Sequence, residues 1–237
     1  MSGRKTVIVT GAAGGIGESL VEAFLSEGYN VVGTSLAASR SLAASPSLVP
    51  VDGDISKEET ATRTVEAAMV HFGSVDVLVN NAGIYRAKSF TDFTTEDLDA
   101  LVSTNLTGFV YMTQLVVKQM LKQKSGSVVS ITASLADQPI ASVHASVSMM
   151  TKGGLNAITR SLAVEYAKQG IRFNAVAPGV VSTPLHKDDK AGALARSPTG
   201  KVVDVKDIVE AVLYLAEADQ VSGEILHVDG GSHAGCW

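Results

Sequence analysis

The 237-residue sequence contains a single cysteine, Cys236, no basic cluster and no long apolar run. One cysteine excludes a disulfide framework and a CxxC metal site, and it fits a reducing compartment. A net charge of −5 without a basic cluster argues against nucleic acid binding, because phosphates require a basic face. No run approaches the roughly 18 apolar residues of a membrane span, and no apolar segment of signal-peptide length precedes the first strand. We therefore expect a cytoplasmic protein with no metal, nucleic acid or membrane partner.

What the sequence does contain is a regular alternation of short apolar runs and longer amphipathic stretches. Near-continuous apolar runs indicate parallel strands that are buried on both faces. The predicted strands are Thr6–Thr10, Asn30–Thr34, Leu48–Val51, Val75–Asn80, Ser127–Thr132, Ile171–Ala177 and Glu224–Asp229. The predicted helices are Gly15–Ser26, Thr60–Phe72, Thr95–Lys122, Ser148–Gln169 and Val203–Ala216. This alternation predicts one α/β domain over residues 1–237, built on a doubly wound parallel sheet.

Two segments interrupt the alternation. Residues 35–47 are small and polar, and they give no clear signal for a second crossover helix. Residues 182–202 show no periodicity and exceed the roughly 12–15 residues of a typical structureless connection. Long connections of this kind are commonly functional or disordered. We interpret 182–202 as a substrate lid that contains one short helix.

A glycine-rich turn follows the first predicted strand. The stretch "VTGAAGGIG" places Gly11, Gly15 and Gly17 between this strand and the next helix. The first glycine permits a tight turn, and the later ones let the backbone approach a pyrophosphate at the helix N-terminus. Close packing of small residues is the alternative reason for such a turn. Its place in the first strand–helix unit favours a nucleotide site.

Several further motifs occur in the same order and spacing as in a known family. With T-G-x-x-x-G-x-G, they make the chain similar to the short-chain dehydrogenase/reductase family essentially from end to end. These motifs are "NNAG" (80–83), "STNLTGF" with Asn105, "SITAS" with Ser134, Lys152, "VAPGVVSTP" with Pro178, Gly179 and Thr183, and "SGEILHVDGG". The resemblance implies a Rossmann-like, three-layer α/β/α fold with about seven parallel strands. It also implies a nicotinamide dinucleotide and a homodimer or homotetramer packed through the long helices.

The resemblance also implies roles for the residues of these motifs. Ile16 and the glycine turn would flank the diphosphate, and Asp54 and Ile55 would lie beside the adenine. Thr183 would hold the nicotinamide amide, Lys152 would grip the ribose, and the Pro178–Gly179 pair would belong to the same cofactor site. Asn81, Ala82 and Gly83 would back the adenosine ribose. Two alternatives remain: Asp54 as a helix N-terminal charge, and a purely structural "NNAG" turn.

The choice between NAD and NADP depends on the end of the second predicted strand. An acid at that place would bind the ribose hydroxyls and repel a 2′-phosphate, but the sequence has Ser35 there, followed by Leu36. The nearest cation is Arg40, and Gly14 stands where a basic residue of the glycine turn would bind the phosphate. The missing acid favours NADP over NAD.

Three positions match the reaction site of the family. By resemblance, Ser134 would orient the substrate oxygen and Asn105 would support a proton-relay water at a helix kink, which "NLTG" suggests. Lys152 would normally lower the pKa of a tyrosine four residues before it. Structural alternatives are a strand-end cap for Ser134, a surface helix position for Asn105 and ordinary exposure for Lys152.

The tyrosine position is occupied by Ser148. A serine hydroxyl cannot delocalise an alkoxide as a phenol does, so it is a poor general acid, although it can relay a proton. Positioned proton transfer contributes about 10²–10⁴ in rate, and its loss requires a replacement. The candidates are His144, which titrates near 6.5 when unperturbed, and Tyr85. Met149 and Met150 also differ from the small residues of the family, with helix packing as their ordinary role.

Three functional hypotheses follow. The first is an NAD(P)-dependent oxidoreductase that acts on a small or medium carbonyl or alcohol with another proton donor. The second is a catalytically idle dinucleotide-binding subunit with a regulatory or structural role. The third is a redox-neutral enzyme that uses the dinucleotide as a transient hydride acceptor or as a structural element. Carbonyl turnover and direct dinucleotide titration distinguish them.

Overall fold

The computed structural model describes residues 3–182 and 197–235. Its centre is a sheet of seven parallel strands in the order β3-β2-β1-β4-β5-β6-β7. The predicted α/β class, the parallel sheet and the strand number are thereby confirmed. The strands are β1 (Thr6–Thr10), β2 (Asn30–Ser35), β3 (Leu48–Asp52), β4 (Val77–Asn80), β5 (Gly126–Ile131), β6 (Ile171–Pro178) and β7 (Ile225–Val228).

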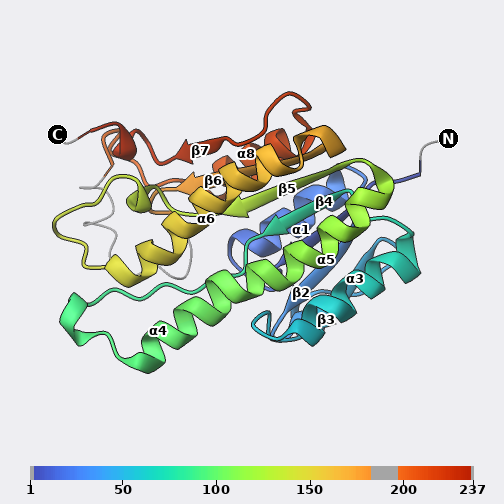
Figure 1. Ribbon diagram of the computed structural model, residues 1–237, viewed down its shortest axis with the longest axis horizontal. Coiled ribbons are helices and arrows are strands. Elements are labelled where there is room, and N and C mark those ends of the chain that lie inside the picture. The colour runs from blue at the N-terminus through green and yellow to red at the C-terminus, as the bar shows by residue number, and fades with distance from the viewer. Residues whose placement is uncertain (1–2, 183–196, 236–237) are drawn as a thin grey trace.

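Helices cover both faces of this sheet. They are α1 (Ile16–Ser26), α2 (Ala38–Ser41), α3 (Glu58–Phe72), α4 (Thr95–Val102), α5 (Gly108–Gln123), α6 (Ser146–Glu165) and α8 (Val205–Glu217). Short helical turns lie at η1 (Phe90–Asp92), η3 (Ser134–Ala136), η4 (Ala167–Gln169) and η6 (Ser232–Ala234), and a π-helical segment at η2 (Ser103–Thr107). Figure 1 shows the sheet between these layers.

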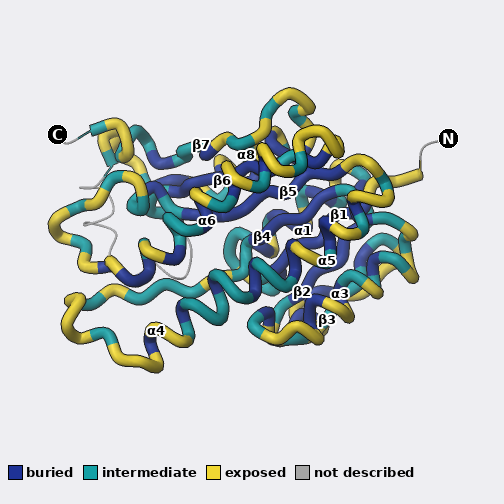
Figure 2. The backbone as a smooth tube through the Cα atoms, in the orientation of Figure 1, coloured by how far each residue is buried: buried dark blue, intermediate teal, exposed yellow. Residues whose placement is uncertain are grey.

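Alternating side chains of the strands form two apolar cores. In β1, Val7 and Val9 pack with α1 and α8 on one face, whereas Ile8 packs with α3 and α5 on the other. All three side chains are fully buried, as the near-continuous apolar runs predict for a sheet covered on both faces. Figure 2 shows these strands buried at the centre, with the exposed helix faces outside.

Local signals set the helix ends. Thr94 and Asp97 form a capping box at the start of α4, and Asp204 and Asp207 form another at α8. Each box satisfies backbone N–H groups that have no partner within the helix. Helix α3 ends at Gly73, whose φ of 78° lies in the left-handed region that favours glycine.

The long predicted helix 95–122 contains the expected kink. Helix α4 and helix α5 are joined by η2, and Asn105 lies at the centre of this π-helical segment. The stretch Thr95–Gln123 is long and apolar enough to cross a membrane by length and composition, with 44% of its window buried. Because Met112, Val116 and Met120 of α5 pack against the sheet and α3, these apolar residues serve the core of the fold.

The structure describes residues 35–47 fully but only the ends of the segment 182–202. Within residues 35–47, the structure has only the single helical turn α2, as the weak signal suggests. Most of the proposed lid, residues 183–196, lies outside the described residues. The ends of the lid segment meet, because Val181 and Val203 form an isolated bridge and Ser182 N–H donates to Val203 O at 2.9 Å.

Candidate active site

The glycine turn lies at the carboxyl edge of the sheet, between β1 and α1. Gly11 and Gly15 have φ values of 65° and 56°, which other residues rarely adopt. A Cβ on Gly17 would lie 2.0 Å from Gly11 O, whereas Gly14 and Gly15 have open space above them. The turn therefore leaves its backbone and the N-terminus of α1 accessible to a diphosphate, so these residues fit a dinucleotide.

The "NNAG" motif packs directly against this turn. The Asn81 side chain donates to Thr10 O at 2.9 Å and to Gly11 O at 3.2 Å. In return, Thr10 Oγ1 accepts from the N–H groups of Asn81 (3.0 Å) and Ala82 (2.9 Å). Asn81 thus holds the turn in place, whatever contact it also makes with a ribose. Thr10 belongs to the "VTG" motif, but no sequence signal indicated this structural role.

The predicted adenine residues Asp54 and Ile55 follow β3, and Ser35 ends β2. Asp54 Oδ1 accepts from Ser56 N–H at 2.9 Å, so its carboxylate stabilises the turn before α3. Ile55 is buried against Gly108. Ser35 pairs in register with Asp52 of β3, an acid that the sequence analysis overlooked.

Asp52 brings a carboxylate to the end of β2 from the neighbouring strand. Its two oxygens accept from Ser39 N–H at 2.7 Å and Ser39 Oγ–H at 2.5 Å. These two hydrogen bonds hold the pKa of Asp52 below its usual value, with weaker contributions from Arg40 and Arg63. The carboxylate is therefore charged at neutral pH, next to the strand end where an acid is missing.

A cavity of about 800 Å³ joins the predicted cofactor residues to the predicted reaction residues. Its lining includes Ile16 of the glycine turn, Gly83, Ser134, Lys152 and Gly179. The arrows of β4, β5, β6 and β7 point toward this edge of the sheet (Figure 1). Other predicted residues in the lining are Asn81, Ser148, His144, Tyr85 and Pro178. The structure thus assembles residues far apart in sequence, whereas Thr183 lies outside the described residues.

Asn105 stands behind this cavity rather than in its lining, and is 2% exposed. Its Oδ1 accepts from Ile84 N–H at 2.8 Å, and its Nδ2 donates to Ile84 O at 3.0 Å and Thr151 Oγ1 at 2.9 Å. The π-helical turn directs the side chain toward the backbone after β4. Asn105 therefore fixes the Gly83–Ile84 wall, which rules out the surface alternative.

Lys152 lies next to this wall. Its Nζ donates to Ile131 O at 2.8 Å, and a Cβ on Gly83 would approach the same Nζ to 3.2 Å. The residue is half-buried, yet desolvation of its ammonium lowers the pKa of Lys152 to about 8. Ser134 opens η3 after β5 and is buried.

Ser148 is buried, and its hydroxyl forms two hydrogen bonds with the backbone of Arg86. Its Oγ donates to Arg86 O at 2.8 Å and accepts from Arg86 N–H at 2.9 Å. The guanidinium of Arg86 and the ammonium of Lys88 both pair with Asp97, which lies at the start of α4. Ser148 thus anchors the loop after β4. No sequence signal indicated this pairing over 62 positions.

The remaining candidate, His144, is exposed at the mouth of the cavity. It also lines a neighbouring cavity of about 460 Å³, together with Phe90, Pro139 and Met149. Within the parts of the chain that the structure describes, no group of three or more His, Cys, Asp or Glu residues could hold a metal ion.

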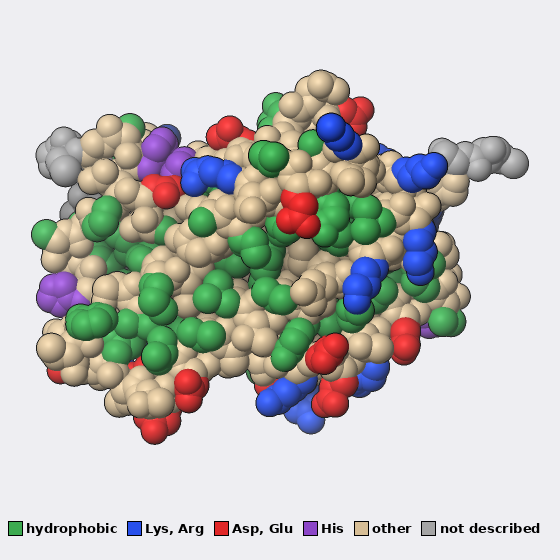
Figure 3. All heavy atoms as spheres, in the orientation of Figure 1, with side chains coloured by type: hydrophobic (Ala, Val, Ile, Leu, Met, Phe, Trp, Pro, Cys, Tyr) green, Lys and Arg blue, Asp and Glu red, His purple; other side chains and the backbone are tan. Residues whose placement is uncertain are grey.

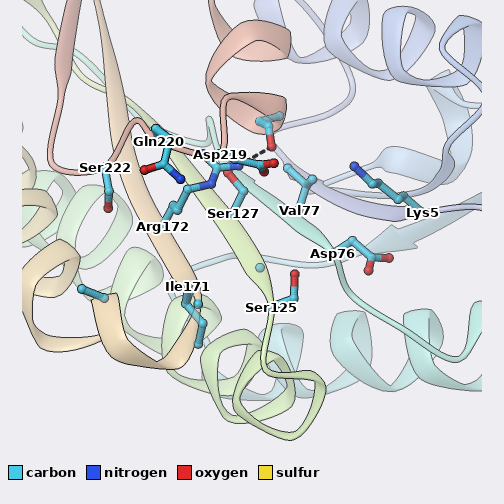
Figure 4. Close-up of a pocket in the computed structure, with 14 residues that line it drawn as sticks. Lys5, Asp76, Val77, Ser125, Ser127, Ile171, Arg172, Asp219, Gln220 and Ser222 are labelled. Carbon is cyan, nitrogen blue, oxygen red and sulfur yellow. Dashed lines mark hydrogen bonds between the residues drawn. The ribbon is translucent and has the colours of Figure 1, made fainter.

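Another cavity, of about 500 Å³, lies at the opposite edge of the sheet (Figure 4). Its charged groups have structural partners. Arg172 donates to Leu215 O at 2.7 Å and Ala216 O at 2.6 Å at the end of α8, and Asp76 accepts from Thr6 N–H at 2.7 Å. Lys5 pairs with Glu217 at 2.7 Å. These charges stabilise strand and helix ends.

Comparison with known proteins agrees with this geometry. A family model described as enoyl-(acyl carrier protein) reductase matches residues 11–233. The 3-oxoacyl-[acyl-carrier-protein] reductase of Thermotoga maritima is 33% identical, over 96% of this chain and 97% of the relative.

Solved structures match over nearly the whole chain. The 3-ketoacyl-(acyl-carrier-protein) reductase of Brucella melitensis complexed with NADH has a TM-score of 0.91 and 30% identity, over 97% of this chain and 98% of that one. ElxO with NADP bound has a TM-score of 0.88 and 28% identity, over 98% and 100%. The chain belongs to the short-chain dehydrogenase/reductase family of NAD(P)-dependent oxidoreductases.

Proposed function

We propose that this protein catalyses hydride transfer between a nicotinamide dinucleotide and the carbonyl or alcohol carbon of a small or medium substrate. The observation that carries the proposal is the single cavity shared by Ile16, Gly179, Ser134 and Lys152. The dinucleotide, when bound, supplies or accepts the hydride. Gly11, Gly15, Gly17 and the N-terminus of α1 would hold its diphosphate.

The walls of the cavity favour a substrate with an apolar body. Ile84, Ile140, Val143, Met149 and Val180 contribute apolar side chains to the lining. Ser134 would donate a hydrogen bond to the reacting oxygen and so orient it. Two of the relatives are named as 3-oxoacyl- or 3-ketoacyl-(acyl-carrier-protein) reductases. Their names support a 3-oxoacyl compound as the first substrate to test.

Turnover with a reduced dinucleotide tests this function. The Ser134→Ala variant should lower kcat by about 10²-fold, because it removes a hydrogen bond to developing negative charge. Lys152→Ala should weaken dinucleotide binding in a direct titration. Unchanged kinetics and affinity in both variants would refute the assignment.

The idle-subunit hypothesis remains the rival, because Ser148 stands where the family resemblance expects a tyrosine. It predicts dinucleotide binding without turnover of any carbonyl or alcohol, and no gain of activity in Ser148→Tyr. A redox-neutral enzyme would instead form product with no net change in the oxidation state of the dinucleotide. Absorbance of the reduced nicotinamide separates all three.

For the cofactor, we propose that both dinucleotides bind and that NADP is favoured by Arg40 and opposed by Asp52. Arg40 lies in α2, directly after the Ser35–Leu36 strand end. Asp52 places a carboxylate in register with Ser35, where it would repel a 2′-phosphate.

The variant Asp52→Asn should therefore strengthen NADP binding by about tenfold while changing NAD binding little, since only NADP carries the extra phosphate. Arg40→Ala should weaken NADP selectively. Glu66→Gln, on exposed α3, controls for the change in net charge. An unchanged ratio of the two dissociation constants in Asp52→Asn would show that this carboxylate does not select the cofactor.

We further propose a cytoplasmic homodimer or homotetramer. Figure 3 shows hydrophobic side chains spread over the face formed by α5 and α6. On this face Leu121, Met150 and Val164 are exposed, and such surface commonly marks an interface. Sedimentation should give a dimer or tetramer mass, and a monomer at micromolar concentration would contradict the proposal.

A further inference from the structure

The proposed reaction requires a proton donor, and the buried cavity wall offers no phenol at position 148. The identity of the group that moves this proton is inferred here on the basis of the proposed function. It depends on the hydrogen bonds and ion pairs of Ser148 and of the titratable side chains that line the cavity.

The Ser148 hydroxyl is committed to the backbone. It has one proton to donate, and that proton goes to Arg86 O at 2.8 Å, while Arg86 N–H donates to its oxygen at 2.9 Å. Delivery of this proton to a substrate would break the anchor of the loop after β4. The neighbouring Thr151 hydroxyl is likewise committed, because it donates to Ser148 O at 2.7 Å.

The other titratable side chains in the lining are Tyr85, Lys88, His144 and Lys152. Lys88 is already committed to an ion pair with Asp97. His144 is exposed at the mouth, on the segment before α6. Tyr85 follows the Ile84 wall and is kept as a variant in the test.

Lys152 has the free donors that this role requires. An ammonium has three N–H groups, and among the described residues its Nζ meets one acceptor, Ile131 O. Glycine at position 83 leaves the space beside Nζ open, since a Cβ there would lie 3.2 Å away. Burial lowers the pKa of Lys152 to about 8, and no carboxylate among residues 3–182 and 197–235 offsets this effect.

We propose that Lys152 is itself the acid and base of the reaction, in the place of the family tyrosine. In reduction, the bound dinucleotide would supply a hydride, whose electron pair would form the new C–H bond at the carbonyl carbon. The carbonyl oxygen takes a proton from the Lys152 ammonium, directly or through one water. The products are an alcohol, an oxidised nicotinamide and a neutral amine, which solvent protonates again.

This role fixes the direction of the pH dependence. Reduction consumes the protonated form of Lys152, so kcat/KM should be high below pH about 8 and fall above it. Alcohol oxidation consumes the neutral amine, so its rate should rise to a plateau above the same pH. A lysine that only grips a ribose would show no such opposite pair of profiles.

The test uses the full-length protein, saturating reduced dinucleotide, and a panel of apolar ketones and 3-oxoacyl thioesters. Lys152→Ala should lose about 10²–10⁴ in turnover, and added ethylamine should restore part of it. Amines of different pKa should restore the turnover of this variant, and its pH dependence should then follow the pKa of the added amine. Lys152→Arg keeps the charge but cannot release its proton near neutral pH, so it should stay slow. Lys168→Ala, an exposed lysine of η4, is the control.

A second readout needs no turnover. Lysine labelled with ¹³C, assigned through Lys152→Arg, should show one ammonium that titrates near pH 8 in the free protein. Lack of rescue by every amine, or an unshifted titration, would overturn the inference with the oxidoreductase function intact. The inference on Lys152 would also be overturned if Tyr85→Phe or His144→Phe, but not Lys152→Ala, removed the pH dependence of turnover. Wild-type protein that binds dinucleotide and reduces no member of the panel would overturn both proposals.

Discussion

Gly17→Ala is expected to weaken dinucleotide binding strongly, whereas Gly14→Ala, in the same turn, should leave it nearly intact. A Cβ on Gly17 would lie 2.0 Å from Gly11 O and 2.7 Å from the Asn81 side-chain nitrogen. The first contact is with backbone, so the turn itself must move. A Cβ on Gly14 meets nothing within 4 Å.

Two measurements can detect the displacement of the turn in Gly17→Ala. Overpacking of this kind costs about 1–3 kcal/mol of stability, which thermal unfolding can detect. Dinucleotide affinity should fall by roughly 100-fold, equivalent to about 2.8 kcal/mol, because the N–H groups that would face the diphosphate are displaced. Equal dissociation constants in the Gly17 and Gly14 variants would contradict the assignment of this turn to the cofactor.

Asn105→Ala is expected to be the most destabilising polar substitution in the site. The variant removes three hydrogen bonds between η2, Ile84 and Thr151, and it leaves both backbone groups of Ile84 without this partner. A buried polar group left unsatisfied costs about 1–3 kcal/mol, so a total of about 3 kcal/mol is expected for the two groups. Turnover should fall as well, because Ile84 and Gly83 form a wall of the cavity.

Asn156→Ala is the matched control for this experiment. Asn156 is also a buried helical asparagine, but within the described part of the chain its side-chain amide bonds only to Asp137, at 3.1 and 3.3 Å. Denaturant unfolding should show a clearly smaller loss for Asn156→Ala. If the two variants lose equal stability, Asn105 does not have the central place that its hydrogen bonds indicate.

The fold could be predicted from the sequence because buried strands and amphipathic helices each produce a local pattern of apolar residues. Seven apolar runs became seven strands, and four of them, β1, β2, β3 and β6, begin at the predicted residues. The "NLTG" signal correctly located the distortion at Asn105. Strand and helix ends were less accurate: β4 begins at Val77 rather than Val75, and α6 ends at Glu165, before the turn η4.

The bonding inside the site could not be predicted, because it joins residues that are distant along the chain. The Ser148–Arg86 pair is separated by 62 positions and depends on the path of the loop after β4. Asp52 joins the end of β2 only through strand register. Neither pairing leaves a periodic signal. The expectations for Thr183 and for most of the lid concern residues outside the described ones.

The central claim is that the cavity beside Ser134 and Lys152 binds a nicotinamide dinucleotide. Calorimetric titration of the wild-type protein with NAD and NADP, each oxidised and reduced, tests it most directly. We predict saturable binding of at least one of the four, with one site per chain. Absence of binding for all four at millimolar ligand would contradict the account.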